Sequence, residues 1–245
     1  MKSIQNQTIG SKISQLKEAI RGIAGRVHRS SDEIRFILVT KTVSPDKIQE
    51  AFDAGIRDFG ENRMQDFLAK KGELPDDIRW HFVGRLQNNK VKFLVEQIKL
   101  NPENPPLLHS LDRPELVLEI ERQATQKRIG RVPCLIQVNS SGEATKGGFV
   151  PEEVAAFVGK LREDSPIEIR GLMTIGPFTE DRKKIREAFR MMKRLQEELQ
   201  KKYGKKQWNL LSMGMSSDYE IAIEEGANLL RLGRVIFGPR KEGTS

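Results

Sequence analysis

Lys41 is the residue of this sequence with the clearest capacity for chemistry. It ends the largely apolar run that begins at Ile34. Alternate residues of a strand share one face, so Lys41 would lie above Val39 and Ile37, over a packed interior. Removal from water disfavours the ammonium form and leaves a neutral amine, the nucleophile of Schiff-base chemistry. A solvated lysine at a strand end is the alternative, and Lys41 by itself does not exclude it.

Two segments near the C-terminus have the composition of an anion site, Ser212–Asp218 and Arg231–Arg234. Loops of glycine and serine that lead into a helix present free backbone N–H groups and hydroxyls. Ser216 would contact a phosphate there, or it would only cap the helix that follows. Arg231 ends an apolar run, so we expect it either to contact a cofactor or to form a structural ion pair.

The elements that would position these residues alternate along the chain. Short apolar runs are followed by longer segments of helical periodicity, eight times over, which predicts a parallel sheet closed into a (β/α)8 TIM barrel of the α/β class. A chain of 245 residues suits one such barrel, for which about 250 residues are typical. The predicted strands are Ile34–Lys41, Arg57–Gly60, Arg79–Gly84, Pro106–Leu111, Val132–Asn139, Ile167–Thr174, Trp208–Met213 and Asn228–Leu232.

Helix boundaries are marked by capping residues. Ser44 and Pro45 begin one helix and Gly55 ends it, while Pro151 begins another over 152–164. The longest predicted helix, Asp181–Tyr203, has apolar residues at three- and four-residue spacing and so one buried stripe. A similar stripe precedes the first strand, and this N-terminal helix would cover the barrel in place of an eighth crossover helix. We expect one domain over residues 1–245.

Composition argues against several functions. The net charge of +8 would attract a polyanion, but the basic residues alternate with acids, as in Arg182–Arg190, and few aromatic residues accompany them. Nucleic-acid binding is therefore not the expected main function. The segment Gly142–Phe149 resembles a phosphate loop only by composition, since it lacks the Gly-Lys-Ser/Thr ending.

Metal and thiol chemistry are also not expected. His28, His81 and His109 are far apart in sequence and lack acidic or cysteine neighbours at ligand spacing. The single cysteine, Cys134, lies in an apolar run, which predicts a buried, inert thiol. No run is long enough to cross a bilayer and residues 1–6 lack a signal sequence, so we expect a soluble, cytoplasmic protein.

Taken in order along the chain, the motifs closely resemble those of the pyridoxal phosphate homeostasis protein family. The resemblance spans nearly the whole sequence, and so many ordered motifs make it specific. The residues that carry it are Val39–Thr42, Phe59–Asn62, Trp80–Lys90, His109–Asp112, Lys146–Phe149, Gly171–Ile175, Ser212–Ser216, Arg231–Gly233 and Ile236–Gly238.

The resemblance implies a barrel of the alanine racemase N-terminal kind (fold type III), with pyridoxal 5′-phosphate (PLP) held as an internal aldimine on Lys41. By the same carry-over, Asn62 would lie beside the ring and Arg231 near the pyridine nitrogen or phosphate. Ser216 and the backbone of Gly233 and Arg234 would hold the phosphate. The family is regarded as non-catalytic, which implies a protein that carries or buffers the cofactor and affects amino-acid and keto-acid balance. PLP-dependent apoenzymes are the partner class that this implies. We expect a monomer.

One departure concerns Arg234, which stands where the family usually has a small hydroxyl residue. Its backbone N–H can still bind phosphate, and its side chain either supplies charge or points away. The rival interpretation is a PLP-dependent racemase. The only tyrosines, Tyr203 and Tyr219, are predicted on helices away from the strand ends, so a racemase acid/base partner is not evident. An arginine at the ring nitrogen would also weaken the electron sink that racemization needs.

Overall fold

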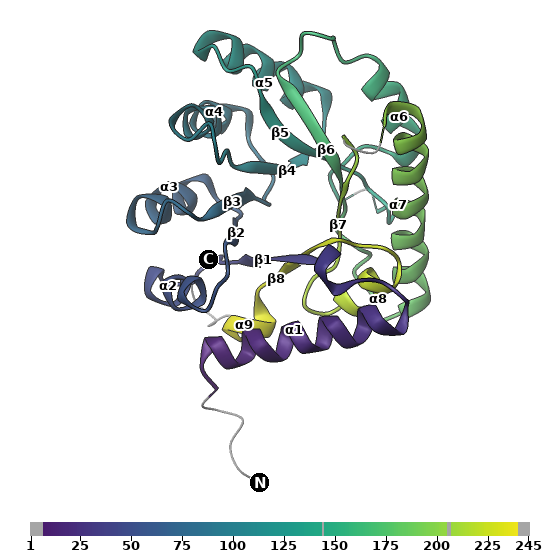
Figure 1. Cartoon of the computed structure of the whole chain (residues 1–245). Helices are drawn as coiled ribbons and strands as arrows, with labels where there is room; N and C mark the ends of the chain where they lie inside the picture. Colours follow the sequence, from purple (N-terminus) through teal and green to yellow (C-terminus); the bar gives the residue numbers. More distant parts are fainter. Residues whose placement is uncertain (1–6, 144, 205–206, 240–245) are drawn as a thin grey trace.

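The computed structural model describes residues 7–143, 145–204 and 207–239. Eight parallel strands close into a barrel in the order β1 to β8, with β8 paired to β1 (Figure 1). The predicted barrel and its strand count are thus confirmed. The strands are β1 (Arg35–Val39), β2 (Asp58–Glu61), β3 (Arg79–Phe82), β4 (Leu107–Leu111), β5 (Val132–Gln137), β6 (Ile167–Met173), β7 (Leu210–Ser212) and β8 (Leu229–Leu232).

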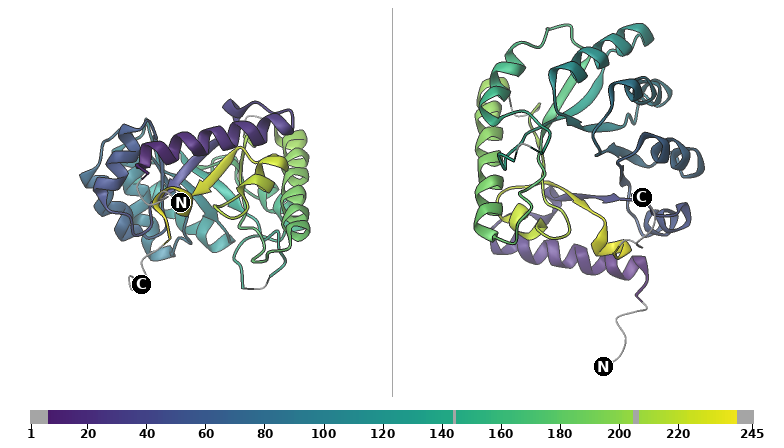
Figure 2. Two further views of the ribbon diagram at one scale, coloured as in Figure 1. Left: turned by 90° about the horizontal axis from the view of Figure 1, so that it is seen from below. Right: turned by 180° about the vertical axis from the view of Figure 1, so that it is seen from behind.

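Helices surround the barrel on its outside. They are α1 (Ile9–Arg26), α2 (Pro45–Asp53), α3 (Met64–Glu73), α4 (Val91–Leu100), α5 (Pro114–Lys127), α6 (Pro151–Gly159), α7 (Arg182–Tyr203), α8 (Tyr219–Glu224) and α9 (Arg234–Phe237). Short 3-10 turns η2 (Ser31–Glu33) and η3 (Asn88–Lys90) precede β1 and α4. The N-terminal helix α1 contacts α2, α8 and α9, and so covers the strands on either side of the β8–β1 junction, as predicted (Figures 1 and 2).

Element ends differ from the sequence prediction by a few residues. The first strand stops at Val39, so Lys41 lies in the turn beyond it rather than within the strand. Helix α6 ends at Gly159 instead of continuing to Asp164, because the chain turns back toward β6 after Lys160. Residues 1–6, on which the prediction about a signal sequence rests, lie outside the described residues. None of the described helices is long and apolar enough to cross a membrane.

Two apolar layers form the core. The larger lies between the strands and the helices, and it includes the single buried stripe predicted for the longest helix, α7. A smaller cluster fills part of the barrel interior and consists of Ile37, Leu135, Met173, Leu210 and Leu229. Buried polar residues occupy much of the remaining interior, among them Asp58, His81, His109, Ser212 and Arg231. The interior of this barrel is therefore built for hydrogen bonding as well as packing.

Candidate functional site

The six residues singled out in the sequence lie at the carboxyl ends of adjacent strands. Lys41 follows β1 and Asn62 follows β2, whereas Ser216 lies in the loop after β7. Arg231 is in β8, and Gly233 and Arg234 form the junction between β8 and α9. Strands β7, β8, β1 and β2 are consecutive in the closed sheet. The structure thus brings these residues to one sector of the barrel face where active sites of such barrels occur.

The backbone beside Lys41 is held by an ion pair on the outside of the barrel. Lys70 of α3 donates to the Thr40 carbonyl at 2.8 Å and to Glu61 Oε1 at 2.6 Å. The Thr40 hydroxyl donates to the same Glu61 oxygen at 2.5 Å. The side chain of Glu61 is fully buried and that of Lys70 is only 11% exposed. Sequence analysis missed Lys70, because no local pattern pairs a residue of α3 with Glu61 at the end of β2.

Lys41 itself is half-buried. Among the described residues, no carboxylate forms an ion pair with it. The next residue, Thr42, has a φ of 62° and donates its hydroxyl to the Lys41 carbonyl at 2.6 Å. A left-handed turn by a β-branched residue is costly and persists only where the surroundings impose it. The turn that carries Lys41 is therefore defined on both sides, by Thr40 and by Thr42.

The loop after β7 meets the N-terminus of α9 through Ser216. Its hydroxyl accepts from the N–H groups of Gly233 and Val235, each at 3.4 Å. Helix α8 has Asp218 rather than a serine as its N-cap residue, so the alternative in which Ser216 only caps that helix is wrong. Gly214 makes the tight turn with a φ of 92°, and a Cβ there would lie 2.5 Å from the Ala222 Cβ.

Arg231 is buried inside the barrel, with an exposed fraction of 6%. Its guanidinium donates to the Ser212 hydroxyl at 2.7 Å and to the Thr174 carbonyl at 2.6 Å. Burial lowers the pKa of Arg231 to about 10, against the opposing field of Asp218. Within the part of the chain that the structure describes, no carboxylate pairs with it directly, so the structural ion-pair alternative is not what the structure contains.

A chain of hydrogen bonds continues from Arg231 across the interior. His109 Nδ1 lies 3.1 Å from Ser212 Oγ, and His109 Nε2 lies 3.0 Å from His81 Nδ1. His81 Nε2 in turn lies 3.0 Å from Asp58 Oδ1. Sequence analysis predicted no contact between these histidines, because 28 positions separate them along the chain. Barrel closure places β3 beside β4 and turns both side chains inward, a relation that no local pattern contains.

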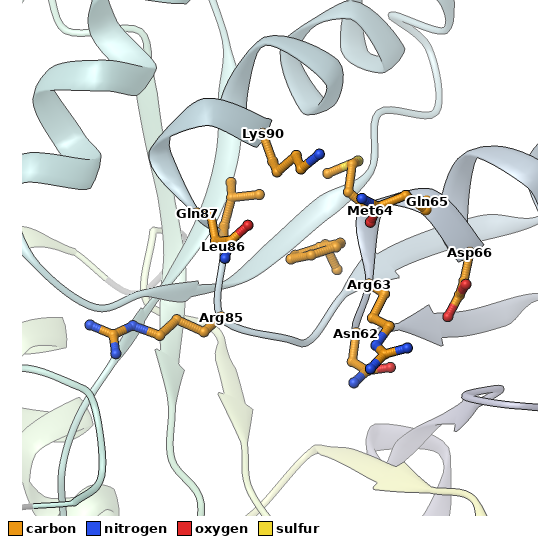
Figure 3. A pocket seen from close by; sticks show the side chains of 10 residues that line it. Asn62, Arg63, Met64, Gln65, Asp66, Arg85, Leu86, Gln87 and Lys90 are labelled. Carbon is orange, nitrogen blue, oxygen red and sulfur yellow. The ribbon is translucent and has the colours of Figure 1, made fainter. Parts of the chain in front are cut away.

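Next to Asn62 lies a cavity of about 550 Å³ (Figure 3). Phe82, Leu86 and Met64 form its apolar part, and Arg63, Arg85 and Lys90 line it with positive charge. The cavity is bordered by Asn62 but by none of the other five predicted residues. The Asn62 side-chain oxygen is buried without a partner. At Gly84, a Cβ would lie only 2.1 Å from the Asn62 carbonyl oxygen, so glycine permits the two loops to touch.

The remaining sequence predictions have mixed outcomes. Arg234 has an exposed side chain, and the N–H groups that contact Ser216 belong to its two neighbours, Gly233 and Val235. Cys134 is buried, and burial raises the pKa of its thiol, as expected for an inert group. Tyr203 donates to the Ala155 carbonyl at 3.2 Å, on the outer side of the barrel. Tyr219 was expected away from the strand ends, but it begins α8 directly beside the Gly214 turn, with its ring packed into the outer apolar layer.

Comparison with known proteins first defines the class. Residues 13–241 match the family described as alanine racemase, N-terminal domain. The solved structure of an alanine racemase from Clostridium difficile 630 aligns with a TM-score of 0.71 at 12% identity, over 95% of this chain and 57% of that one. At that identity the likeness concerns the fold alone.

Closer relatives share both sequence and length. The pyridoxal phosphate homeostasis protein of Aquifex aeolicus is 41% identical over 94% of this chain and 97% of its own. The protein of the same name from Pseudomonas aeruginosa is 35% identical over 96% and 97%. PipY of Synechococcus elongatus, solved with PLP bound, aligns with a TM-score of 0.77 at 31% identity, over 94% of this chain and all of that one. The chain belongs to the pyridoxal phosphate homeostasis protein family.

Proposed function

We propose that this chain binds PLP through a Schiff-base linkage to Lys41 and carries or buffers the cofactor without turning over a substrate. The observation that carries the proposal is the relation between Lys41 and Arg231. Ile37 pairs with Arg231 in the register of β1 and β8, so Lys41 lies four residues further toward the open end of the barrel. A half-buried amine therefore lies above a buried cation, the arrangement needed for an aldehyde at one end of a ring and an acceptor nitrogen at the other.

Polar groups that lack full partners fit the rest of the cofactor. The buried Asn62 oxygen has no partner within the described residues, and Asn62 follows β2, the strand that pairs with β1 before Lys41. Arg231 has five N–H donors, of which two are used by Ser212 and Thr174. A ring with a hydroxyl and a basic nitrogen offers a donor to the first and an acceptor to the second. Asn62 and Arg231 are thus the proposed ring contacts.

The phosphate would bind between the β7 loop and α9. Ser216 accepts from the N–H groups of Gly233 and Val235 only at 3.4 Å, long enough for a better acceptor to replace it. A Cβ at position 233 would lie 3.0 Å from the Val39 carbonyl oxygen, so glycine also brings β8 close to the turn of Lys41. Ser216 and the backbone of Gly233 and Arg234 are the proposed phosphate contacts.

The site favours holding the cofactor over using it. When bound, PLP supplies an electron sink, and its strength depends on a protonated ring nitrogen. A guanidinium has donors but no acceptor, so Arg231 hydrogen-bonds the unprotonated nitrogen. Neither tyrosine ring reaches the barrel interior: Tyr203 and Tyr219 pack in the outer apolar layer. These features favour a carrier over an amino-acid racemase, the second candidate.

We further propose that the recipients of the cofactor are PLP-dependent apoenzymes, since a carrier needs an acceptor protein. The cytoplasmic location and the monomeric state expected from the sequence remain predictions.

The test is an absorbance spectrum of the purified protein incubated with PLP, followed by borohydride reduction and mass spectrometry. We expect a visible Schiff-base band and, after reduction, a pyridoxyl adduct on Lys41. Lys41→Ala should lose both. Lys90→Ala is the matched control, because Lys90 is also half-buried and lines the neighbouring cavity.

Each result has a distinct meaning. A protein that cannot be reconstituted with PLP would refute the proposal. An adduct on Lys90 would show that the Schiff base forms there and not on Lys41. Turnover of amino acids by the loaded protein, lost in Lys41→Ala, would support the racemase alternative instead. Transfer is tested by activation of a PLP-dependent apoenzyme with loaded protein in the presence of a trap for free PLP.

A further inference from the structure

The interior hydrogen-bond chain has a fixed direction. Arg231 is a donor with no acceptor atom, so Ser212 must accept from it and keeps its own hydrogen for another partner. At the other end Asp58 is a carboxylate. Burial opposes its ionisation, but hydrogen bonds from His81 and Arg79 outweigh burial and hold its pKa well below the usual range. One end of the chain can only donate and the other can only accept.

Burial favours the neutral form of both histidines between these ends. Burial lowers the pKa of His81, and it lowers that of His109 further, with the fields of His81 and Arg231 adding to the effect. A neutral imidazole has one donor and one acceptor nitrogen. His81 therefore donates from Nε2 to Asp58 and accepts at Nδ1, and His109 donates from Nε2 to His81 and accepts at Nδ1 from the Ser212 hydroxyl.

Geometry agrees with this assignment. The two imidazole rings are inclined at 71°, so the N–H edge of one ring meets the other at a steep angle. All five members are buried, with exposed fractions of 0% to 6%. They come from five strands, β2, β3, β4, β7 and β8, so the chain spans much of the interior. At its far end Arg79, whose side chain is 50% exposed, holds Asp58 with a bond of 2.6 Å.

We propose that Asp58, His81, His109 and Ser212 are positioning residues that orient Arg231 toward the cofactor ring. This inference rests on the proposed function, since it assigns a role to Arg231 at the PLP ring. The guanidinium of Arg231 is held by two acceptors, and one of them, Ser212, is itself held through three further hydrogen bonds that end at Asp58. A change at Asp58, the first residue of β2, alters cofactor binding through this hydrogen-bond chain.

The first test measures direction without any cofactor. Nitrogen-detected NMR of the wild-type protein reports the tautomer of each histidine. We expect the Nε2–H tautomer for His81 and for His109, with neither ring protonated near neutral pH. An Nδ1–H tautomer or an imidazolium at His109 would overturn the assigned direction.

The second test uses Asp58→Asn. An asparagine cannot accept at both of its side-chain atoms from Arg79 and His81, so the acceptor-only end is lost. We expect the dissociation constant for PLP to rise about three- to tenfold, the range of coupling along such networks. The absorbance of the bound cofactor should shift as well, which a purely structural effect on the far end of the barrel would not cause.

Glu168→Gln is the matched control. Glu168 lies near the start of β6, as Asp58 lies at the start of β2, but it is not a member of the hydrogen-bond chain. It pairs with Arg131 at 3.1 Å and Arg170 at 3.2 Å. It should change the PLP dissociation constant by less than about twofold. If Asp58→Asn fails to fold, Ser212→Ala replaces it, with the same rise expected.

The outcomes separate this inference from the proposed function. Equal PLP affinity and spectra in Asp58→Asn, or in Ser212→Ala, and in Glu168→Gln would overturn the positioning role while wild-type binding at Lys41 left the proposed function intact. A wild-type protein that fails to bind PLP would overturn the proposed function and the positioning role together, and the tautomers would then report only the direction of the chain.

Discussion

Two buried cations flank the strands of the β8–β1–β2 sector, and they are stabilised in different ways. Lys70, outside the barrel, pairs with the fully buried carboxylate of Glu61 at 2.6 Å. Arg231, inside the barrel, is bonded only to the neutral oxygens of Ser212 and Thr174. A buried charge that lacks a counter-charge is costly, whereas a paired one is compensated.

The difference separates structure from binding. The Lys70–Glu61 pair uses its charges on each other and fixes the Thr40 carbonyl, one residue before Lys41. Arg231 forms no direct ion pair with a carboxylate of the described residues, and only the field of Asp218 acts on its charge, at the base of the proposed cofactor site. Of two buried cations, the one without a carboxylate partner is therefore the better candidate for a ligand contact.

The largest effect is expected when the compensated pair is broken. Glu61→Gln leaves Lys70 buried beside a neutral group and should lower the free energy of unfolding by about 3 kcal/mol. Chemical denaturation measures this loss. The double variant Glu61→Gln, Lys70→Met should recover at least half of it, because no buried charge is then left unpaired. Equal stability of the single variant and the wild type would show that the pair is not compensating.

Arg231→Met should affect PLP binding more than stability, the opposite of Glu61→Gln. It removes an uncompensated buried charge, so we expect the free energy of unfolding of the PLP-free protein to change by less than about 1 kcal/mol. Affinity for PLP should fall by about 2 kcal/mol, the usual contribution of a hydrogen bond to a charged group. Denaturation and a binding titration measure the two quantities. Strong destabilisation with unchanged affinity would reverse the roles assigned to the two cations.

Lowering the pH should destabilise the protein through the two histidines of the interior hydrogen-bond chain. His81 and His109 have folded pKa values below the ordinary 6.5, so the unfolded chain takes up protons first as the pH falls. Their contribution to stability is present above pH 6.5 and is lost as the pH falls below it. Unfolding free energies at pH 7 and pH 5 check this. His109→Gln should show a smaller difference, and an identical one would contradict the assignment.

The smallest effects concern the phosphate end. Ser216→Ala should weaken PLP binding by about 1 kcal/mol, because it removes one hydroxyl contact. Arg234→Ala should change binding by less than about twofold, since that side chain is exposed. Parallel titrations compare the two. A larger loss from Arg234→Ala would mean that its charge replaces the hydroxyl usual at this position.

Much of the fold was predictable because its signals are local. Ser44 is the N-cap residue of α2 and Pro45 is its first residue, as predicted. The helix predicted from Asp181 is α7, where Asp181 is the N-cap and accepts from the Lys183 N–H at 2.9 Å. Every predicted strand overlaps an observed one. Exact ends were less predictable: Lys41 lies beyond β1 because ladder pairing to β2 and β8 stops by Val39. Pairing depends on neighbouring strands, which one segment of sequence does not specify.

Hydrophobic periodicity, helix caps and motif spacing are local features of the sequence, and they were sufficient to predict the barrel, to single out Lys41 and to order the motifs. Only the tertiary structure decided that Lys70 supports the turn of Lys41 and that His81 and His109 join Asp58 to Arg231. Those contacts form when barrel closure brings strands and helices together and turns particular side chains inward. A buried polar group must find its partner in space, and that partner's distance along the chain carries no signal of the contact.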